Sequence, residues 1–468
     1  MSGVHAPVAI GANDDSLVGK KVTVITWDAK YKIGNKVVGE SELGDILTVN
    51  KVKGDWLGFE GHSGFLKRAD VTTSDKAIKY LSDKINEAPK LSAGFHNRGI
   101  CRQKRGEYDK AIADFSEAIR LDPKNYSAYN SRGVTWQDKQ DNDKAIPDFE
   151  NAVRLNAKYS QAYYNCGNSW RYKGIQDKAI EAYTNALRLD PKYELCYLYR
   201  GVSDSLKHDE DKAIEDFTEA IRLNPKNQDT FQNRGNSWYV KRDFENAVAD
   251  YSDAIRLEPK NAGLYFNRGN AWTQKGDYAK AIDDFSEAIK IDPKYTDAYT
   301  NRGVALVDNQ EYEKAIPDYD EAIRLNPNSS PQFNNRGWAY VNLGNYDKAV
   351  ENYHESIRID PSNTFALTNR AILLSTCSDA KIRNGETAVA DATKVCELTN
   401  WKSDNSLETL SIALAEAGKF DDAVKRLQSA IDMNPTNNRA FRDEAMGDFK
   451  AQKPYRQQPK GATPKESK

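Results

Sequence analysis

Asparagine side chains recur at a fixed spacing along this chain, and their chemistry suits the binding of an extended peptide. Seven of them are separated by 34 residues or by twice that number: Asn97, Asn165, Asn233, Asn267, Asn301, Asn335 and Asn369. Three more each follow a member of this series by three residues: Asn168, Asn236 and Asn270. An amide carries a donor and an acceptor, so it can pair with both polar groups of a peptide backbone. The spacing predicts a column of peptide-binding amides; helix packing without a ligand is the alternative interpretation.

Residues arranged for catalysis or metal binding are not found in the sequence. Ser63 stands in Gly61-His62-Ser63-Gly64, which lacks the second glycine and the strand-to-helix context of a nucleophile elbow. The five histidines are scattered and fit no zinc-binding spacing. We therefore expect no catalytic residue, no metal site and no cofactor, and we expect that the protein is not an enzyme.

The five cysteines form no closely spaced pair of the C-x-x-C kind. They are Cys101, Cys166, Cys196, Cys377 and Cys396. We expect free thiols in the hydrophobic core, in a reducing compartment.

Composition narrows the classes of partner. The 468 residues include 67 basic and 69 acidic side chains, a net charge of -2, which argues against nucleic-acid binding. No run of 18 apolar residues is present, so we expect no membrane insertion. The first twenty residues lack the pattern of a secretory signal. The localisation stays unknown: cytoplasmic as the sequence stands, periplasmic or extracytoplasmic if a leader has been removed.

The elements that must position the asparagines are repeats of 34 residues, marked by three further periodic features. An Arg-Gly dipeptide begins at Arg98, Arg132, Arg200, Arg234, Arg268, Arg302 and Arg336. An Ala-Ile or Ala-Val dipeptide begins at Ala111, Ala145, Ala179, Ala213, Ala247, Ala281, Ala315 and Ala349. A proline recurs at Pro123, Pro191, Pro225, Pro259, Pro293, Pro327 and Pro361. Each 34-residue repeat shows the pattern of two helices, A and B. These helices must stack on neighbouring repeats to bury their apolar faces.

The pattern of each unit resembles the tetratricopeptide family, from about Ser92 to Asn437. The sixth repeat shows it in Tyr265, Gly269, Trp272, Ala281, Phe285, Ala288 and Pro293, at repeat positions 4, 8, 11, 20, 24, 27 and 32. The resemblance implies a mainly α chain: a right-handed α-solenoid of about ten helical hairpins over residues 92–437. The ninth hairpin has a longer turn, because Ala388-Val389 arrives five residues late.

A second periodic pair predicts a contact inside each repeat. Position 7 is arginine and position 23 is aspartate in six repeats: Arg98 with Asp114, Arg132 with Asp148, Arg200 with Asp216, Arg234 with Asp250, Arg268 with Asp284, and Arg302 with Asp318. The third repeat has lost both residues and carries Cys166 and Ala182. Two antiparallel helices would bring these positions together, so we expect an Arg–Asp pair that braces helix A against helix B. The alternative is that the arginine and the aspartate are both inherited from an ancestral repeat and are not coupled energetically.

The ends of the chain have a different composition. Residues 74–91 are expected to form a capping half-repeat, residues 438–450 a capping helix, and residues 451–468 a disordered basic tail. Residues 1–15 are expected to be flexible. Residues 16–72 contain short β-rich runs separated by glycine-containing turns, which predicts a small β-barrel. The segments 54–57 and 64–71 resemble a bacterial Src-homology-3-like domain, a module that often binds peptides or cell-wall material.

The family resemblance places a ligand surface on helix A. It implies that positions 2, 5, 6, 9, 12 and 13 line the inner surface, where Tyr164, Tyr172, Tyr239, Phe266 and Trp338 could supply pockets. The charged clamp of some chaperone-binding members needs Lys and Arg at positions 2, 5 and 6, where this chain carries Ala93, His96, Ser127, Asn130 and Gln161.

These observations predict a scaffold that binds proteins or peptides in its groove. A structural component with possible self-association, and a regulatory or targeting subunit of a separate enzyme, are the alternatives.

Overall fold

The computed structural model describes residues 74–456 continuously, with side chains from Ala77 onward, and only strands before that segment. The strands are β1 (Lys21–Val24), β2 (Ala29–Ile33), β3 (Lys36–Ser41), β4 (Ile46–Lys53), β5 (Trp56–Phe59), β6 (Phe65–Lys67) and β7 (Val71–Thr72). They pair antiparallel in the order β3-β2-β6-β5-β4-β1-β7. Their connections and side chains lie outside the described residues, so the Src-homology-3-like barrel stays a prediction. The expected flexible segment 1–15 lies outside them as well.

The described part of the chain contains 22 helices, which alternate between A and B helices. The A helices are α2 (Ser92–Lys104), α4 (Tyr126–Asp138), α6 (Ser160–Tyr172), α8 (Glu194–Leu206), α10 (Gln228–Val240), α12 (Ala262–Lys275), α14 (Thr296–Asp308), α16 (Ser330–Asn342), α18 (Thr364–Thr376) and α20 (Asp404–Glu416). The B helices are α3 (Tyr108–Leu121), α5 (Asn142–Leu155), α7 (Gln176–Leu189), α9 (Glu210–Leu223), α11 (Phe244–Leu257), α13 (Tyr278–Ile291), α15 (Tyr312–Leu325), α17 (Tyr346–Ile359), α19 (Gly385–Leu398) and α21 (Phe420–Met433). Helices α1 (Ser74–Glu87) and α22 (Arg439–Lys450) stand at the two ends.

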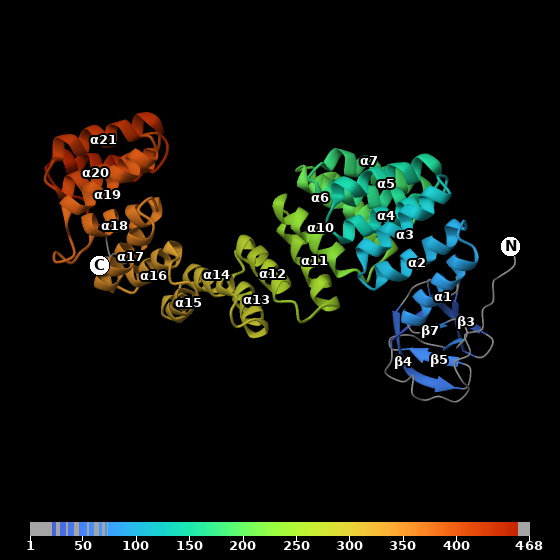
Figure 1. Ribbon diagram of the computed structural model, residues 1–468. Helices are drawn as coiled ribbons and strands as arrows, with labels where there is room; N and C mark the ends of the chain where they lie inside the picture. Colours follow the sequence, from blue (N-terminus) through green and yellow to red (C-terminus); the bar gives the residue numbers. More distant parts are fainter. Residues whose placement is uncertain are drawn as a thin grey trace. The chain divides into compact units, whose positions relative to one another are not determined.

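The chain divides into two compact units, residues 1–237 and 238–468. In the first unit, consecutive helices pack against each other from the α1–α2 pair to the α8–α9 pair, and in the second unit from the α11–α12 pair to the α21–α22 pair (Figure 1). The expectation of a mainly α chain of stacked helical hairpins is therefore confirmed. Within the described residues, no helix is both long enough and apolar enough to cross a bilayer.

The B helices begin and end where the sequence supplies caps. The Asp277 carboxylate accepts a hydrogen bond from the Lys280 backbone N–H at the start of α13, and Asp141 does the same for α5. Most B helices carry a base in their last turn, such as Arg120 in α3, which favours the negative end of the helix dipole. A proline in the following turn, such as Pro123, cannot continue the helix.

Close contact between the two helices of a repeat depends on the glycine at position 8. A Cβ atom added to Gly269 would lie 2.7 Å from the ring of Phe285, and one added to Gly99 would lie 2.6 Å from Phe115. Position 8 therefore needs a small residue, and the aromatic ring at position 24 is the main cause. The ninth repeat carries Ala371 with Ala392, where smaller side chains stand on both sides of the same contact, and both are fully buried.

The Arg–Asp pairs lie where the sequence places them. Five arginines donate both Nε–H and Nη2–H to the aspartate of the same repeat at 2.6–2.9 Å: Arg98, Arg132, Arg200, Arg268 and Arg302. Arg370 and Asp391 form the same pair across the longer turn of the ninth repeat. The predicted geometry of the brace is confirmed in these five repeats, and Arg370 extends it.

Each of these arginines also contacts the preceding repeat, which the sequence did not predict. Arg268 Nη1 donates to Ser252 Oγ at 2.9 Å, and Arg302 Nη1 donates to Ser286 Oγ at 2.9 Å. The acceptor stands at position 25 of the repeat before. One guanidinium therefore joins helix A, its own helix B and the previous helix B.

A different arginine holds the C-terminal helix. Arg442 is fully buried in α22, and its guanidinium contacts Asp404 at 2.8 Å and Glu408 at 2.7 Å, both on α20. Arg456 Nη1 contacts Glu416 at 2.6 Å. The segment 451–456, which the sequence assigns to a disordered tail, thus lies against the last hairpin, and residues 457–468 are outside the described part.

Helix α8 contains a buried carboxylate where five of the ten repeats have an aromatic ring. Asp204 is 6% exposed and stands at position 11, the place of Trp170 in α6 and Trp272 in α12. Burial and the nearby Asp216 raise the pKa of Asp204 to about 6, although Arg200 opposes the shift. Asp209 raises the pKa further and Lys212 lowers it.

We expect Gly269→Ala to lower the free energy of unfolding by about 1–3 kcal/mol, because the new methyl group must displace the Phe285 ring. The midpoint of urea unfolding measures this change. Gly447→Ala is the control, since its Cβ would meet no atom within 4 Å; the better helix propensity of alanine there favours stability by up to about 1 kcal/mol. Equal losses in both variants would contradict the packing argument.

We expect a double-mutant cycle of Arg268→Met and Asp284→Leu to give a coupling energy of about 2 kcal/mol, because the pair is shielded and doubly hydrogen-bonded. Arg268→Met alone is the more damaging single change, since it leaves a buried carboxylate unpaired. The exposed pair Glu287–Lys290 is the control, with an expected coupling below about 0.5 kcal/mol. A value near zero for the first pair would support common ancestry without coupling.

We expect Asp204→Asn to stabilise the chain at pH 7.5 by about 1–2 kcal/mol and to have little effect at pH 4. The folded pKa lies above the unfolded value, so the folded protein loses stability as the pH rises from about 4 to about 6. Thermal midpoints at the two pH values measure the difference. Asp209→Asn is the control, because its pKa is lowered by Lys212 and its pH dependence has the opposite sign.

Candidate functional site

In each of the two units, positions 2, 5, 6, 9, 12 and 13 of the A helices of the first nine repeats form a candidate surface, here called the A-helix face. Charged side chains at these positions are Lys104, Asp138, Arg171, Asp229, Asp297 and Asp308. Amides, hydroxyls, aromatic rings and aliphatic side chains fill most other positions. The surface therefore suits a mostly uncharged ligand that is recognised through hydrogen bonds and apolar contacts.

In the first unit, two predicted asparagines are engaged inside the protein. Asn165 Nδ2 donates to Asn130 Oδ1 at 3.0 Å, and Asn165 Oδ1 accepts from Gln161 Nε2 at 3.1 Å. Asn165 is 6% exposed. Asn168 Oδ1 accepts a hydrogen bond from the Tyr183 hydroxyl at 2.7 Å. Asn165 therefore serves the packing of α6 on α4.

In the second unit, the same kind of bond joins neighbouring A helices. Asn301 Nδ2 donates to Asn270 Oδ1 at 2.7 Å, and Asn369 Nδ2 donates to Asn334 Oδ1 at 3.0 Å. Asn335 Oδ1 accepts from Asn334 Nδ2 at 3.3 Å. The structure thus brings Asn270 and Asn301 into direct contact.

A common geometry underlies several of these bonds: position 6 of one repeat faces position 5 of the repeat before it. Asn165 faces Asn130 and Asn369 faces Asn334 in this way, and Ser131 Oγ lies 3.1 Å from His96 Nε2. The partner at position 5 varies in type, and where it is Phe266, Asn301 bonds to position 9 instead.

Asn97, Asn267 and Asn233 are less engaged. Asn97 and Asn267 are half-buried, and neither makes a side-chain hydrogen bond with any residue that the structure describes. Asn233 Nδ2 donates to the Asp229 carbonyl on its own helix at 2.8 Å, which leaves its carbonyl oxygen to accept. Asn236 is exposed.

A cluster of tyrosines and one arginine lies on the A-helix face of α6 and α8. The Tyr164 ring centroid lies 4.9 Å from that of Tyr193 and 6.1 Å from that of Tyr199. The Arg171 guanidinium carbon lies 4.4 Å from the centroid of Tyr172 and 4.8 Å from that of Tyr199. Burial raises the pKa of Tyr164 to about 12, so its hydroxyl stays protonated and can donate.

Sequence analysis found only part of this cluster. Tyr164 and Tyr172 were predicted as pocket residues, whereas Arg171 was missed. Tyr199 was not predicted as a pocket residue either. The available signal was that Arg171 and Tyr199 stand at positions 12 and 6, both on the predicted ligand surface.

The other predicted aromatic residues are distributed over the second unit. The Phe266 centroid lies 5.0 Å from Tyr295 and 5.8 Å from Phe285. Tyr239 packs edge-on against Phe244, the first residue of α11, at 5.3 Å. Trp338 is 41% exposed, and Phe365 at position 2 of α18, which the sequence analysis missed, is 76% exposed.

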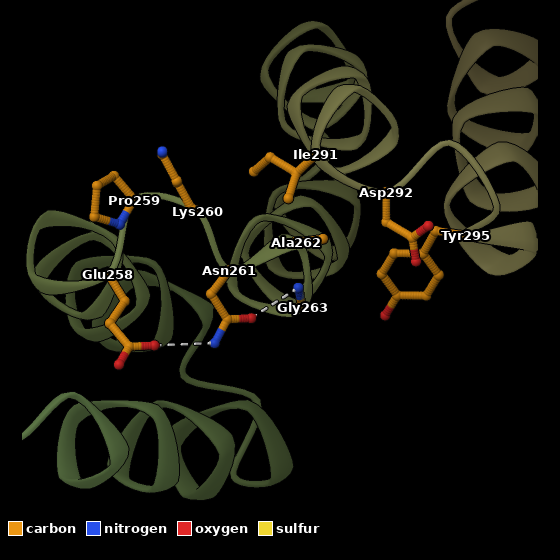
Figure 2. Close-up of a pocket in the computed structure, with 9 residues that line it drawn as sticks. All are labelled: Glu258, Pro259, Lys260, Asn261, Ala262, Gly263, Ile291, Asp292 and Tyr295. Atoms are coloured by element: carbon orange, nitrogen blue, oxygen red, sulfur yellow. Dashed lines mark hydrogen bonds between the residues drawn. The ribbon is translucent and has the colours of Figure 1, made fainter.

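A hollow of about 780 Å³ lies beside the turn between α11 and α12, with the end of α13 and Tyr295 on its other side (Figure 2). Within the turn, Asn261 Nδ2 donates to Glu258 and Asn261 Oδ1 accepts from the Gly263 N–H at 3.1 Å. The polar groups of the turn therefore serve its own conformation, and Tyr295 connects the hollow to Phe266 on the A-helix face.

The thiols and acids of the described residues offer no assembled reactive group. All five cysteines are free and buried, as expected, and burial raises the pKa of Cys166 to about 12. No group of three or more histidine, cysteine, aspartate or glutamate side chains is placed to hold a metal ion in the part of the chain that the structure describes.

Solved structures and protein families give the following comparisons. YrrB, described as a TPR protein with an unusual peptide-binding site, is 21% identical over 41% of this chain and 98% of its own, with a TM-score of 0.37. MamA is 26% identical over 35% of this chain and 96% of its own, with a TM-score of 0.34. Yeast Tom70 is 17% identical over 81% of this chain and 92% of its own, with a TM-score of 0.39. No curated protein sequence matches the chain.

Family models match the repeats directly. The tetratricopeptide repeat model matches residues 92–125, 160–193, 296–329 and 330–363. A model described as TPR repeat matches residues 269–310, and a further tetratricopeptide repeat model matches residues 409–446. The matches fall on the helical hairpins and agree with the spacing of the arginine, alanine and proline positions. The matched stretches of the chain therefore carry tetratricopeptide repeats.

Proposed function

We propose that the A-helix face binds extended peptide segments of partner proteins through its asparagine column. Tetratricopeptide repeats generally act as protein–protein interaction scaffolds, because their stacked helices present one long surface. The low charge of the A-helix face supports a ligand recognised through its backbone amides. An asparagine amide can donate to a backbone carbonyl and accept from a backbone N–H at the same time.

The observation that carries the proposal is the division of the column into two groups. Asn165, Asn301 and Asn369 bond to the neighbouring repeat, so they fix the spacing between A helices. Asn97 and Asn267 have no such partner among the described residues, although both are partly accessible. Polar groups in a partly desolvated surface without partners favour a ligand that supplies them.

Aromatic side chains give the same surface a means of selecting side chains of the peptide. Trp338 and Phe365 are exposed on α16 and α18, and the tyrosine cluster lies on α6 and α8. Large rings with a polar atom are common anchors in protein interfaces.

The segment 16–72 is proposed to be a Src-homology-3-like module that adds a second binding region. The antiparallel pairing of its seven strands is compatible with that proposal.

We expect Asn97→Ala and Asn267→Ala each to weaken peptide binding by about threefold to tenfold, since one hydrogen bond contributes about 0.5–1.5 kcal/mol. The probe is a fluorescent peptide selected by the full chain from a random library, and anisotropy measures its affinity. Asn301→Ala is the matched control: it removes a bond between repeats and is expected to lower the thermal midpoint, which Asn97→Ala and Asn267→Ala leave unchanged.

The same variants separate this proposal from self-assembly. Light scattering gives the mass of each variant in solution. A changed mass with unchanged peptide affinity would replace the proposal by a role in assembly, and unchanged affinity and mass in both Asn97→Ala and Asn267→Ala would remove the asparagines from the binding surface.

A further inference from the structure

Arg171 on α6 is a half-buried cation without a carboxylate partner among the residues that the structure describes. Other arginines on the A helices do have one. They are Arg98 and Arg102 with Asp114, Arg132 with Asp148, Arg200 with Asp216, Arg268 with Asp284, Arg302 with Asp318, Arg336 with Asp320, and Arg370 with Asp391. The Nε atom of Arg171 is buried and has no hydrogen-bond partner. A charge that is partly removed from water favours an anion close to it.

The surroundings of Arg171 hold its guanidinium in place, and some of its N–H donors remain unused. Tyr172 and Tyr199 lie within 4.4 Å and 4.8 Å, measured from the guanidinium carbon to the ring centroids. The hydroxyls of Tyr172 and Tyr183 also hydrogen-bond to the guanidinium, and its five N–H donors, which lie in one plane, outnumber these contacts. The donors in that plane are the ones that a planar carboxylate accepts from in a bidentate contact.

Asn168 adds a second donor on the same helix face, three residues before Arg171. Its Oδ1 accepts from the Tyr183 hydroxyl, and its amide also hydrogen-bonds to Tyr164, which orients the amide and leaves one N–H of Nδ2 to donate. The tyrosine hydroxyls are protonated, since burial raises the pKa of Tyr164 and of Tyr183. The cluster therefore presents one positive charge, several donors and no acidic group.

We propose that Arg171 and Asn168 bind one carboxylate of the peptide, from an aspartate or glutamate side chain or from its C-terminus. This inference rests on the proposed peptide-binding function and adds a charge requirement at one place along the ligand. A carboxylate fits better than a phosphate because only one cation is available. Lys173 is paired with Asp143, and Lys178 lies over Trp170 at 4.1 Å, so neither adds its charge to the site.

The sixth repeat shows the same arrangement without the charge. Phe266 stands in the place of Tyr164, and Asn270 in the place of Asn168. Thr273 stands where the third repeat has Arg171, and Asn301 stands where the following repeat has Tyr199. Of these two repeats, only the third therefore requires a carboxylate. A bound peptide is expected to carry an acidic group at one fixed position.

The test is a selection of random peptides, with both internal acids and free C-termini, by the full chain and by Arg171→Gln. The unaltered chain is expected to enrich an acidic group at one register, and Arg171→Gln is expected to lose that preference while it still captures peptides. Lys104→Gln is the matched control, because it removes one positive charge from the same face in another repeat. Thermal melting of Arg171→Gln verifies that the variant is folded.

Synthetic versions of one enriched peptide then give the affinity. Replacing its acidic group by the matching amide is expected to weaken binding to the unaltered chain at least tenfold and to leave the affinity of Arg171→Gln unchanged. Comparing internal acids with C-terminal amidation distinguishes the two sources of the carboxylate.

Three outcomes would overturn the inference. Selected peptides without an acidic position would remove the charge requirement and leave the proposed function in place. An acidic preference that survives in Arg171→Gln would place the requirement elsewhere. A phosphorylated version that binds more tightly than the acidic peptide, and does so only with Arg171, would assign the site to phosphate. A selection that yields no peptide for any variant would instead reject the proposed function itself.

Discussion

The arginine at position 7 makes the contact on which the described array depends. Its Nε and Nη2 atoms hold the aspartate of the same repeat, and its Nη1 atom holds a hydroxyl of the preceding repeat. A hairpin of two short helices cannot bury its apolar face alone, so stability must come from stacking. The guanidinium makes the spacing and the rotation of that stack specific, because a planar group with fixed donors tolerates little displacement. Burial raises the pKa of Asp284 even though Arg268 opposes the shift, which indicates how far the aspartate has been removed from water.

The contact between A helices imposes a second constraint, and it limits which residues are available to a ligand. Position 6 of one repeat faces position 5 of the previous one, and an asparagine at position 6 bonds there in the two cases where position 5 is also asparagine. Asn165 donates a hydrogen bond to Asn130, so this part of its amide is not available to a ligand. Asn97 and Asn267 lie outside such bonds, and a ligand can use both their donor and their acceptor. The same column thus serves the stack at some repeats and is open to a ligand at others.

The sequence predicts the contacts that all repeats share, and the reason is geometric. Residues at fixed offsets in a repeated hairpin must lie at fixed positions in space, so Arg98 and Asp114 could be paired from their spacing alone. The bond from Arg268 to Ser252 requires the offset between neighbouring repeats, which the spacing does not contain. The burial of Arg442 depends on Asp404 and Glu408 in a final hairpin that departs from the pattern. Tyr199 was missed because its neighbour Arg171 comes from another repeat, and only the three-dimensional stack brings the two together.

The third repeat departs from the Arg–Asp pattern, and its departures compensate one another. Cys166 and Ala182 replace the Arg–Asp pair and pack in one apolar cluster with Phe149, which removes the need for a buried ion pair. The repeat then gains a cation at position 12, where no aspartate of the described array reaches it. This cation, Arg171, lies on the A-helix face beside Tyr172 and Tyr199. The third repeat can still stack without the Arg–Asp pair. Its surface cation, Arg171, is available to a ligand.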